Sequence, residues 1–430
     1  MITSIDKLKL NKIQTIQGFV ENIRNKPNIC FLVIKDVTSK IQVTVVKEKQ
    51  PQFNELLDKI TNQTVLTIKG KMIKNEGVKL NGVEIIPESI EIETISASPL
   101  PLDDTSLLDQ RIDFRWLDLR SEKNQLLFKV QTYMTHVMKE FLFKQNFIEI
   151  HTPSLIGTAS ESGSEVFEIS NYFGKKAYLA QSPQFYKQLA ICGGLEKVVV
   201  VGPVFRAENS RTTKHATEFT GFDLEFSGVD SCKDVMNLEE KMLVYMLKKV
   251  KTKYGKEIER LFNKPVIIPS SKFPSMRLED VYKELKQKYN YEVPLQDQGD
   301  INAEGEKFVE KLAMDKYKSE FMFITGYSKE TRPFYHARDQ KGEPQGYDLI
   351  WRGVEITSGA KRENRYDVLK KQAEEKGLGK DVQFYLDFFK YGCAPHGGFG
   401  IGLDRLTMLL LGISIKEVQF VCRNPDRLIP

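Results

Sequence analysis

Short apolar runs separated by polar turns fill the first 96 residues of the chain. In the run at 40–47, Ile41, Val43 and Val45 alternate with residues such as Gln42 and Thr44, which is the period of a half-buried strand. Five runs of this kind lie at 16–23, 31–36, 40–47, 65–71 and 83–92. So many short strands in so few residues predict a small β-barrel.

One stretch within this region departs from the strand pattern. Between 51 and 60, Phe53, Leu56 and Leu57 recur at helical spacing, between the third and fourth predicted strands. An OB-fold often carries a helix at that place. We therefore predict an OB-fold barrel over residues 1–96, followed by a linker at 97–122 whose SASPLPLDD sequence is rich in proline and small residues.

Long helices that alternate with isolated strands are expected from 123 to 430. Apolar side chains recur at Leu127, Val130, Met134 and Val137, which predicts an amphipathic helix. Further helices are expected at 233–254, 278–289, 303–317 and 363–376, and strands at 197–205, 219–226, 346–357 and 397–404. The pattern predicts a large α+β domain.

Composition and charge narrow the classes of function. No apolar run of 18 residues occurs and the start MITSIDKLKL does not resemble a leader, so we expect a cytoplasmic protein without a membrane span. Five widely separated cysteines without a CxxC pair suggest neither a disulfide framework nor a zinc site. Residues 1–80 hold 14 Lys/Arg and 7 Asp/Glu, a net charge of +7. This basic barrel suits a polyanionic partner, although a solvated lysine-rich surface would give the same count.

The stretch at 202–226 reads as a hairpin with a long polar tip. Arg206 stands at its entrance and Phe219 at its exit. An arginine on a strand can hold a phosphate through two hydrogen bonds, and a nearby aromatic ring can stack on a base. The pair therefore predicts a nucleotide site, against the alternative of a surface hairpin with ordinary charge pairs.

Two further stretches add groups that suit a nucleotide. HGGFGIGLDR, at 396–405, runs from glycines into a helix that carries Arg405, but the βαβ unit of a dinucleotide fold has no room after it. In 347–362, Asp348 and Glu355 are seven positions apart and could face one Mg²⁺ only if the strand is broken near residues 351–353. Ordinary salt bridges on a strand are the alternative.

These stretches together resemble motifs of the class II aminoacyl-tRNA synthetases. The helix-strand that ends at Pro153 resembles motif 1, residues 202–226 resemble motif 2, and GLDR at 402–405 resembles motif 3. QSPQFYKQ at 181–188 is similar to the aspartyl branch of this class, and the short length resembles its archaeal and eukaryotic kind. The resemblance implies an antiparallel catalytic sheet flanked by helices behind an OB-fold anticodon-binding domain.

Roles for individual residues follow from this resemblance alone. Arg206 and Arg405 would be the catalytic phosphate-binding groups. The family's ATP site would be formed by Arg206, Ala207, Glu208, Lys214, His215, Ala216, Phe219, Glu355, Gly402, Leu403, Asp404 and Arg405. The family's aspartate site would be formed by Glu161, Ser182, Gln184, Lys187, Arg206, Asp223, Ser358 and Arg362, and its Mg²⁺ site by Glu355, Ser358 and Asp348. Phe31 and Gln42 resemble the pair that reads the anticodon.

The reaction implied is the activation of L-aspartate by ATP and its transfer to tRNA(Asp), with tRNA(Asn) as a possible second acceptor. A homodimer is expected by analogy with the family. An asparaginyl enzyme is the main alternative; Lys187 and Arg362 disfavour it, because we expect that a neutral amide would leave both buried cations without a counter-charge. A tRNA-binding descendant without activity, or an amidating relative, is disfavoured by the retention of Arg206, Glu355 and Arg405.

Overall fold

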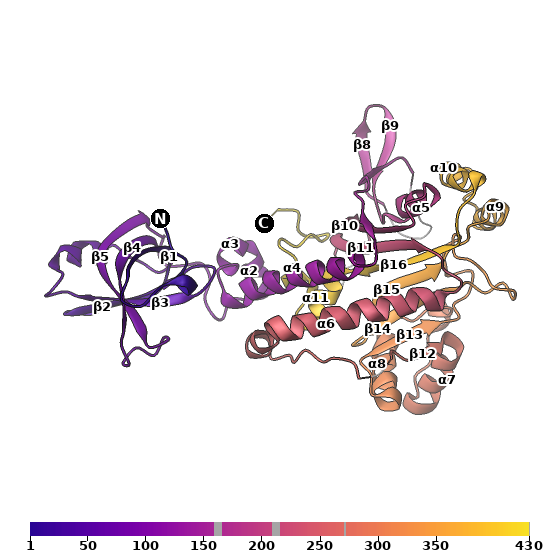
Figure 1. The fold of residues 1–430 in the computed structure, drawn as a ribbon. Coiled ribbons are helices and arrows are strands. Elements are labelled where there is room, and N and C mark those ends of the chain that lie inside the picture. The colour runs from indigo at the N-terminus through magenta and orange to yellow at the C-terminus, as the bar shows by residue number, and fades with distance from the viewer. Residues whose placement is uncertain (159–165, 209–215, 271, 430) are drawn as a thin grey trace. The chain divides into compact units, whose positions relative to one another are not determined.

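The computed structural model divides the chain into two units, Met1–Phe114 and Arg115–Pro430 (Figure 1). It describes residues 1–158, 166–208, 216–270 and 272–429. The boundary between the units falls inside the segment 97–122 that the sequence marks as a linker.

Five strands of the first unit close into a barrel. They are β1 (Ile13–Asn25), β2 (Ile29–Lys35), β3 (Lys40–Val46), β4 (Val65–Lys74) and β5 (Val83–Thr94), in the order β1-β2-β3-β5-β4. Alternate side chains such as Leu32, Ile34 and Val43 fill the interior without exposure. The period-2 pattern of the sequence therefore marks the inner face, and the predicted barrel is confirmed.

The helix predicted at 51–60 is shorter than expected. A 3-10 turn, η2 (Pro51–Phe53), leads into one turn of helix, α1 (Asn54–Leu57), between β3 and β4. Proline at the first position fits a helix start, because its missing N–H would have no partner there. The apolar side chains of Phe53 and Leu57 are part of the barrel core.

An eight-stranded sheet organises the second unit. In spatial order it holds β12 (Ser275–Arg277), β13 (Phe321–Thr325), β14 (Gly346–Trp351), β15 (Val354–Lys361), β16 (His396–Gly402), β11 (Glu218–Ser227), β10 (Lys197–Phe205) and β6 (Ile148–Glu149). The pairs β12–β13 and β6–β10 at the two edges are parallel, and all pairs between them are antiparallel. The predicted antiparallel catalytic sheet is confirmed.

The single strand predicted at 346–357 is a tight hairpin. Arg352 and Gly353 both have positive φ, at 49° and 69°, and reverse the chain between β14 and β15. This is the break expected between Asp348 and Glu355. It brings Asp348 opposite Ser358 across the two strands.

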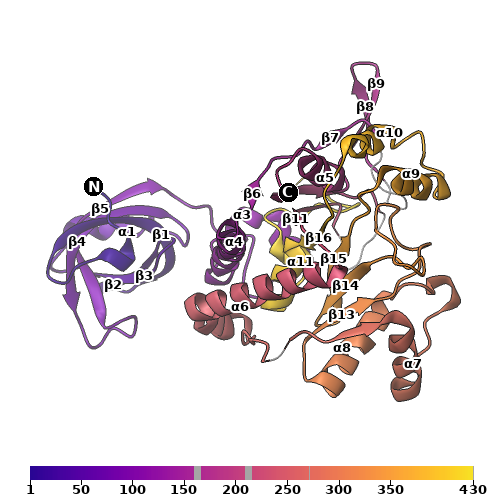
Figure 2. The same ribbon diagram turned by 45° about the vertical axis from the view of Figure 1, so that its right-hand side comes forward.

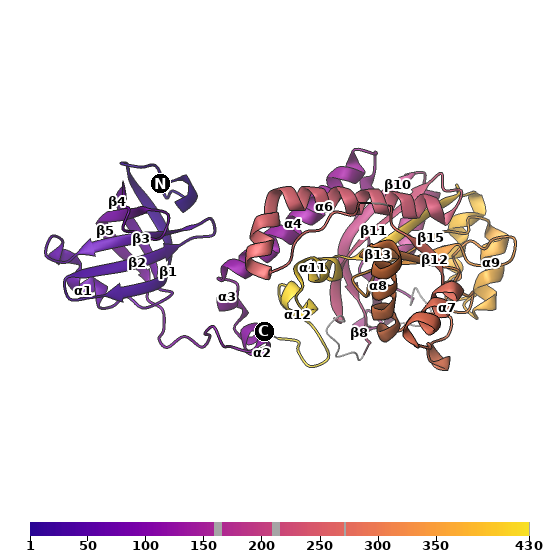
Figure 3. The ribbon, with the colours of Figure 1, turned by 90° about the horizontal axis from the view of Figure 1, so that it is seen from below.

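Two long helices cover one face of the sheet. α4 (Glu122–Phe143) and α6 (Cys232–Phe262) lie against each other along that face (Figure 3). Their apolar side chains join Phe222, Leu224 and Phe399 of the strands in the largest hydrophobic core. The opposite face of the same strands is left for polar side chains.

The second unit holds further short elements, namely α3 (Arg115–Asp118), α5 (Gln184–Cys192), α7 (Leu278–Tyr289), α8 (Ala303–Tyr317), α9 (Tyr366–Glu375), α10 (Gln383–Leu386), α11 (Leu403–Leu411) and α12 (Ile415–Val418), with 3-10 turns η3 (Leu295–Asp297) and η4 (Asp387–Tyr391). The first unit also contains the 3-10 turn η1 (Ile5–Lys7) and the helix α2 (Leu108–Asp113). A small sheet of β7 (Leu155–Ile156), β9 (Lys175–Leu179) and β8 (Glu168–Tyr172) projects from the second unit (Figure 2).

Candidate active site

Strand alternation places the polar groups of β11 on the face away from the long helices. Phe222 and Leu224 point into the hydrophobic core, so Asp223 and Glu225 between and after them face the other way. The motif-2 stretch thus supplies two carboxylates on one side of the sheet. Sequence reasoning had singled out Asp223 alone.

The glycines of β16 make room for these two carboxylates. Gly400 lies opposite Asp223 and Gly398 opposite Glu225. A Cβ atom on Gly400 would lie 2.7 Å from Asp223 Oδ1, and one on Gly398 would lie 2.5 Å from Glu225 Oε2. The alternating glycines of HGGFGIG therefore have a local cause that sequence alone did not reveal: they leave space for the protein's own acidic side chains.

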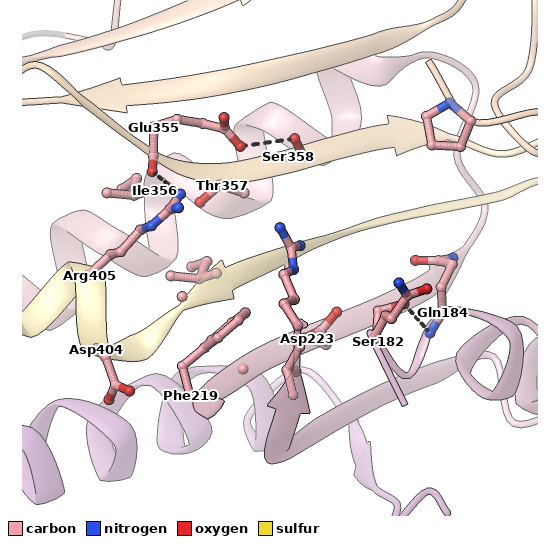
Figure 4. A pocket seen from close by; sticks show the side chains of 18 of the residues that line it. Ser182, Gln184, Phe219, Asp223, Glu355, Ile356, Thr357, Ser358, Asp404 and Arg405 are labelled. Carbon is pink, nitrogen blue, oxygen red and sulfur yellow. Dashed lines mark hydrogen bonds between the residues drawn. The ribbon is translucent and has the colours of Figure 1, made fainter. Parts of the chain in front are cut away.

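A cavity of about 390 Å³ opens over this face of the sheet (Figure 4). Most of the predicted ligand-binding residues line it, namely Ser182, Gln184, Arg206, Glu208, Ala216, Phe219, Asp223, Glu355, Ser358, Arg362, Gly402, Asp404 and Arg405. Arg405 and Glu355 mark one end, and Ser182 and Gln184 mark the other. We call these the phosphate end and the amino-acid end.

Other predicted residues lie elsewhere. Lys187, Ala207, Asp348 and Leu403 are described but do not line the cavity. Glu161, Lys214 and His215 lie outside the described residues. Their predicted roles remain predictions.

The amino-acid end is held by four alternating charges. Lys187 Nζ, which is fully buried, lies 2.8 Å from Asp223 Oδ1 and 3.7 Å from Glu225 Oε2. Arg362 Nε donates to Glu225 Oε1 at 2.9 Å. Burial alone would raise the pKa of Glu225, but Arg362 and Lys187 lower it below its usual range. Two cations and two carboxylates thus balance each other.

This balance corrects one expectation. Lys187 and Arg362 were expected to be left without counter-charges unless a ligand carboxylate joined them, and that expectation is wrong, because Asp223 and Glu225 already pair with them. Sequence reasoning missed Glu225. Its signal was present, since FDLEF places it two residues after Asp223 and therefore on the same strand face.

Arg362 still has a donor to offer. Its Nε is used by Glu225, and its Nη2 donates to Gln184 Oε1 at 3.2 Å and to Gly398 O at 3.1 Å. Its Nη1 makes no hydrogen bond to the described part of the chain. One N–H pair of a guanidinium that is otherwise fixed is therefore available to a ligand in the cavity.

A buried network of neutral groups stands behind this end. Gln188 Oε1 accepts from Gln184 Nε2 and from the Tyr385 hydroxyl, each at 3.0 Å, and Gln188 Nε2 lies 2.9 Å from His396 Nε2. Burial lowers the pKa of His396, so its ring is neutral. His396 Nδ1 then donates to Ala394 O at 2.8 Å and Nε2 accepts from Gln188. These hydrogen bonds hold the side chain of Gln184 in one position at the amino-acid end.

The phosphate end begins at the mouth of the β10–β11 hairpin. Arg206 lies with its guanidinium carbon 5.6 Å from the centre of the Phe219 ring, and its Nη1 is 3.7 Å from Glu208 Oε1. The Arg206 side chain is 39% exposed. The predicted pairing of an arginine with an aromatic ring is therefore present, on a side chain that solvent and ligands can reach.

Arg405 approaches from the helix that follows the glycine strand. Gly402 caps α11, and a Cβ on it would meet the Arg405 side chain at 3.6 Å. Arg405 Nη1 donates to the backbone oxygen of Glu355 at 3.0 Å (Figure 4). Asp404 turns away and accepts from Gln131 and Gln419, which ties α11 to α4. The helix start thus presents a cation at the cavity.

The predicted metal ligands are arranged around one hydroxyl. Ser358 Oγ lies 2.5 Å from Asp348 Oδ1 and 3.3 Å from Glu355 Oε1. Both oxygens of Asp348 also accept from Arg332, a buried arginine that sequence reasoning missed and for which no motif gave a signal. Asp348 is therefore largely neutralised by the protein itself.

Glu355 differs from Asp348. It forms no ion pair with the residues that the structure describes. Burial, together with the nearby Asp348, raises the pKa of Glu355 to about 7. A carboxylate with oxygen neighbours and a surplus of negative charge is a donor set that suits a hard cation such as Mg²⁺.

No trio of His, Cys, Asp or Glu side chains is placed to hold a metal within the described residues. Mg²⁺ usually takes one or two carboxylates from a protein and fills its shell with water and phosphate oxygens. The single free carboxylate of Glu355 is compatible with that mode.

The barrel presents a separate polar patch. Gln42 Nε2 donates to Glu84 Oε2 at 3.2 Å, and Glu84 also accepts from Thr44 and from Asn75. Phe31 lies opposite Thr44 on the neighbouring strand and is partly exposed. The predicted pair of Phe31 and Gln42 therefore shares the outer face of β2 and β3, with Glu84 as a neighbour that the sequence did not suggest.

No helix among the described residues is long and apolar enough to cross a membrane.

Comparisons with known proteins agree with this geometry. A family model described as tRNA synthetases class II (D, K and N) matches residues 108–425, and one for an OB-fold nucleic acid binding domain matches residues 14–93. The aspartate–tRNA(Asp) ligase of Pyrococcus abyssi is 38% identical over 424 residues, which cover 96% of this chain and 95% of that protein. The aspartate–tRNA(Asp/Asn) ligase of Methanopyrus kandleri is 39% identical, with the same coverage.

Among solved structures, the asparaginyl-tRNA synthetase of Pyrococcus horikoshii with bound asparaginyl-adenylate superposes with a TM-score of 0.90 at 29% identity, over the full length of both chains. The fold alone therefore does not separate the aspartyl and asparaginyl branches. The family model and the relatives that match over nearly the full length do identify the family of the chain. It belongs to the class II tRNA synthetases of the D, K and N group, and specifically to the family of the aspartate–tRNA ligases.

Proposed function

We propose that this chain is an aspartate–tRNA ligase that activates L-aspartate with ATP and transfers it to tRNA(Asp). The observation that carries the proposal is one cavity with two unlike ends. Arg206, Phe219 and Arg405 suit a nucleoside triphosphate at one end, and Arg362 beside Asp223 suits an amino acid with an acidic side chain at the other.

In the first step, an oxygen of the α-carboxylate of aspartate attacks the α-phosphorus of ATP, and pyrophosphate leaves. Arg206 holds the phosphate under attack, Phe219 stacks on the adenine, and Arg405 holds the far phosphates. No protein nucleophile is needed, because fixed positive charge and an in-line arrangement lower the barrier. In the second step, a hydroxyl of the terminal ribose of the tRNA attacks the adenylate carbonyl and AMP leaves.

Glu355 and Ser358 would hold Mg²⁺, with Asp348 behind Ser358. When bound, the ion would neutralise part of the triphosphate charge. The raised pKa of Glu355 supports this assignment, because a cation at the carboxylate would relieve the repulsion from Asp348 that helps to raise it.

At the amino-acid end, Asp223 accepts from the substrate ammonium, and Arg362 Nη1 donates to the side-chain carboxylate. Lys187 acts through Asp223, since it is buried behind it. Aspartate is preferred over asparagine because a charge-assisted hydrogen bond to Arg362 is stronger than one from a neutral amide oxygen. The preference rests on this one available donor rather than on two unpaired cations.

The barrel would bind the anticodon through Phe31 and Gln42, with its surplus of positive charge attracting the phosphates. Charging of tRNA would place the enzyme in the cytoplasm. Relatives named for both tRNA(Asp) and tRNA(Asn) make tRNA(Asn) a second candidate acceptor.

We also propose a homodimer that uses the segment around Pro153. Phe143, Ile148 and Leu155 are each close to half exposed, an apolar surface on and after α4 that a second copy would cover. Sedimentation should then give about 99 kDa, twice the 49.4 kDa chain. A stable and active monomer at micromolar concentration would contradict the dimer.

One assay series tests the function. Pyrophosphate exchange is measured with aspartate and with asparagine, and charging is measured with transcripts of tRNA(Asp) and tRNA(Asn). Exchange that depends on aspartate, together with charging of tRNA(Asp), supports the proposal. Exchange with asparagine alone would replace it by the asparaginyl alternative, and tRNA binding without exchange would indicate a descendant without activity.

A further inference from the structure

A buried histidine lies next to Arg362 on the wall of the cavity. His336 forms an isolated antiparallel bridge with Arg362, the residue that follows β15. Residues that face each other across such a bridge carry their side chains on the same face, with Cβ atoms about 5 Å apart. Only 4% of His336 and 3% of Arg362 is exposed, and both residues line the cavity. His336 therefore belongs to the amino-acid end.

Gly346, the first residue of β14, leaves space for the imidazole ring. A Cβ atom on Gly346 would lie 2.7 Å from His336 Nδ1 and 3.0 Å from His336 Cε1. Gly346 precedes Asp348 by two residues on the same strand, so both lie on one face of the sheet. Any other residue at 346 would displace the ring. Glycine thus makes room for His336 in the way that Gly400 makes room for Asp223.

The imidazole nitrogens of His336 have no partner in the described part of the chain. The residue forms hydrogen bonds through its backbone: its N–H donates to Pro333 O at 3.2 Å, and its oxygen accepts from Gln372 Nε2 at 3.1 Å. Nδ1 is buried without a hydrogen bond, and Nε2 forms none with the described residues. A buried polar ring whose nitrogens are both unused is costly, unless a ligand pairs with one of them.

The surroundings of the ring determine which nitrogen carries the proton. Burial, together with Arg362 and Arg332, lowers the pKa of His336 well below its usual value, so the ring is neutral and holds one N–H. Nδ1 lies against Gly346, where no acceptor from the described residues meets it. A proton on Nδ1 would be left unpaired, whereas a proton on Nε2 can reach a ligand in the cavity. Nε2 is therefore the donor.

We propose that His336 determines amino-acid specificity by donating from Nε2–H to the side-chain carboxylate of aspartate, beside the bond from Arg362 Nη1. This inference rests on the proposed function and deepens it. Arg362 supplies the charge-assisted hydrogen bond to one oxygen of the carboxylate, and His336 supplies a neutral donor for the second oxygen. Two neighbouring donors match the two oxygens of a carboxylate.

Asparagine cannot satisfy both donors. Its amide oxygen can accept from Arg362 Nη1, but its NH₂ group would then face His336 Nε2–H, donor against donor. The ring could accept from that amide only by moving its proton to Nδ1, where no described residue accepts it. Either arrangement leaves a buried donor unpaired, so the second donor sharpens the rejection of asparagine.

The first test removes the donor and measures pyrophosphate exchange. His336→Leu replaces the ring by an apolar side chain of similar size. A hydrogen bond to a charged group corresponds to a roughly tenfold to 100-fold change, so the KM for aspartate should rise by about that factor, and the KM for ATP should change less than about twofold. Because asparagine loses no bond, the preference for aspartate should shrink by the same factor.

His336→Gln separates a donor from a packing role. The amide nitrogen of glutamine can donate to aspartate in place of Nε2, and its amide oxygen can turn to accept from asparagine. The KM for aspartate should stay within about threefold of the unmodified protein, while kcat/KM for asparagine should rise about tenfold. A ring needed for packing alone would give the opposite order, because leucine fills the space and glutamine brings unpaired polar atoms into it.

His136→Leu is the control for both variants. His136 is exposed on α4, where its ring stacks with Tyr133, and it does not line the cavity. This variant should leave the constants for aspartate, asparagine and ATP unchanged.

A second measurement does not depend on catalysis. The chain has five histidines, so the NMR spectrum of protein with ¹⁵N-labelled histidine contains few signals, and the signals that His336→Gln removes identify this residue. We expect the pattern of a neutral ring with its proton on Nε2. Aspartate should shift the Nε2 signal of His336, and asparagine at the same concentration should not.

Several results would overturn the role of His336. A proton on Nδ1, an Nε2 signal that aspartate does not shift, or an unchanged KM for aspartate in His336→Leu would each do so. If the unmodified protein activates aspartate in these cases, the proposed function stands and this inference alone fails. If the unmodified protein does not activate aspartate, both fail. Thermal unfolding shows whether each variant is folded, and the spectrum of the unmodified protein decides if His336→Leu is not.

Discussion

The two ends of the cavity use similar charged side chains, but they differ in how those charges are paired and exposed. At the amino-acid end, Lys187 is fully buried and both cations already have carboxylate partners. At the phosphate end, Arg206 is 39% exposed and its ion pair with Glu208 is long, while Glu355 has no ion pair with any described residue. We call the amino-acid end the closed end, because its charges are paired with each other before a ligand binds. We call the phosphate end the open end, because the Arg206 side chain is partly exposed and Glu355 has no ion pair with any described residue.

The difference follows from what each end would bind. Aspartate is small and carries only about one net negative charge, so a pocket whose own charges are paired can be fixed in advance by hydrogen bonds, and selectivity comes from geometry. A triphosphate brings several negative charges, so cations that stay solvated cost little to keep and are neutralised on binding. Substitutions at the two ends should therefore change different kinetic constants: kcat at the phosphate end and the KM for aspartate at the amino-acid end.

The largest effect is expected from Arg206→Ala at the open end. Loss of one fixed donor to the reacting phosphate should lower kcat for pyrophosphate exchange by about 10²–10³-fold. Thermal stability should hardly change, because the side chain is half exposed. Arg338→Ala is the matched control, since it removes an arginine that pairs with Glu375 outside the cavity. Near-normal exchange in Arg206→Ala would remove the residue from the catalytic site.

Lys187→Met tests the closed end. It leaves Asp223 and Glu225 with only Arg362 between them, so the pocket gains a net negative charge that repels the substrate carboxylate. The KM for aspartate should rise more than about 30-fold, with a smaller rise for ATP, and the preference over asparagine should shrink.

Lys139→Met removes a partly exposed lysine that pairs with Glu149 and serves as the control for this variant. Equal increases in the KM for aspartate and for ATP would mean that Lys187 supports the whole domain and not the amino-acid end.

A change outside both ends gives the baseline for the comparison. Phe31→Ala in the barrel should reduce charging of tRNA(Asp) roughly tenfold through loss of base stacking, and should leave pyrophosphate exchange unchanged. Phe19→Ala removes another partly exposed aromatic ring of the barrel and should have little effect. A loss of exchange in Phe31→Ala would contradict the separation of the two activities.

The smallest effect expected is a dependence on pH at the open end. The pKa of Glu355 is raised to about 7, so its carboxylate is charged above that pH and protonated below it. A protonated carboxyl group cannot hold Mg²⁺, and the apparent Mg²⁺ affinity in pyrophosphate exchange should fall up to about tenfold from pH 8 to pH 6.

Glu355→Gln should weaken the Mg²⁺ affinity at both pH values and remove this dependence. Glu239→Gln is the control, because burial also raises the pKa of Glu239 to about 7, yet this residue bonds to Tyr347 and does not line the cavity. An unchanged pH dependence in Glu355→Gln would assign it to another group.

Sequence periodicity was enough to predict the two architectures. Alternation at Ile41, Val43 and Val45 marked the inner face of the barrel, and the recurrence of Val130, Met134 and Val137 marked the buried face of α4, because burial selects apolar residues at the period of each element. The break between Asp348 and Glu355 could also be predicted, since Arg352–Gly353 favours a turn.

The site was less predictable than the fold. Motif residues such as Arg206, Phe219 and Arg405 could be named because each belongs to a short stretch whose own sequence is characteristic. The roles of Arg332 and Gln188 could not be predicted, because only the folded chain brings them to Asp348 and to His396. For Glu225, the strand and the face of the sheet could be predicted from the sequence. Its two cationic partners could not, because they come from other elements.

The preference for aspartate over asparagine tests the central claim most directly. It is measured as the ratio of kcat/KM in pyrophosphate exchange by the unmodified protein. A balanced pocket in which Arg362 Nη1 supplies one charge-assisted hydrogen bond predicts a ratio of at least about 10² in favour of aspartate. A ratio near one, or a preference for asparagine, would contradict the account.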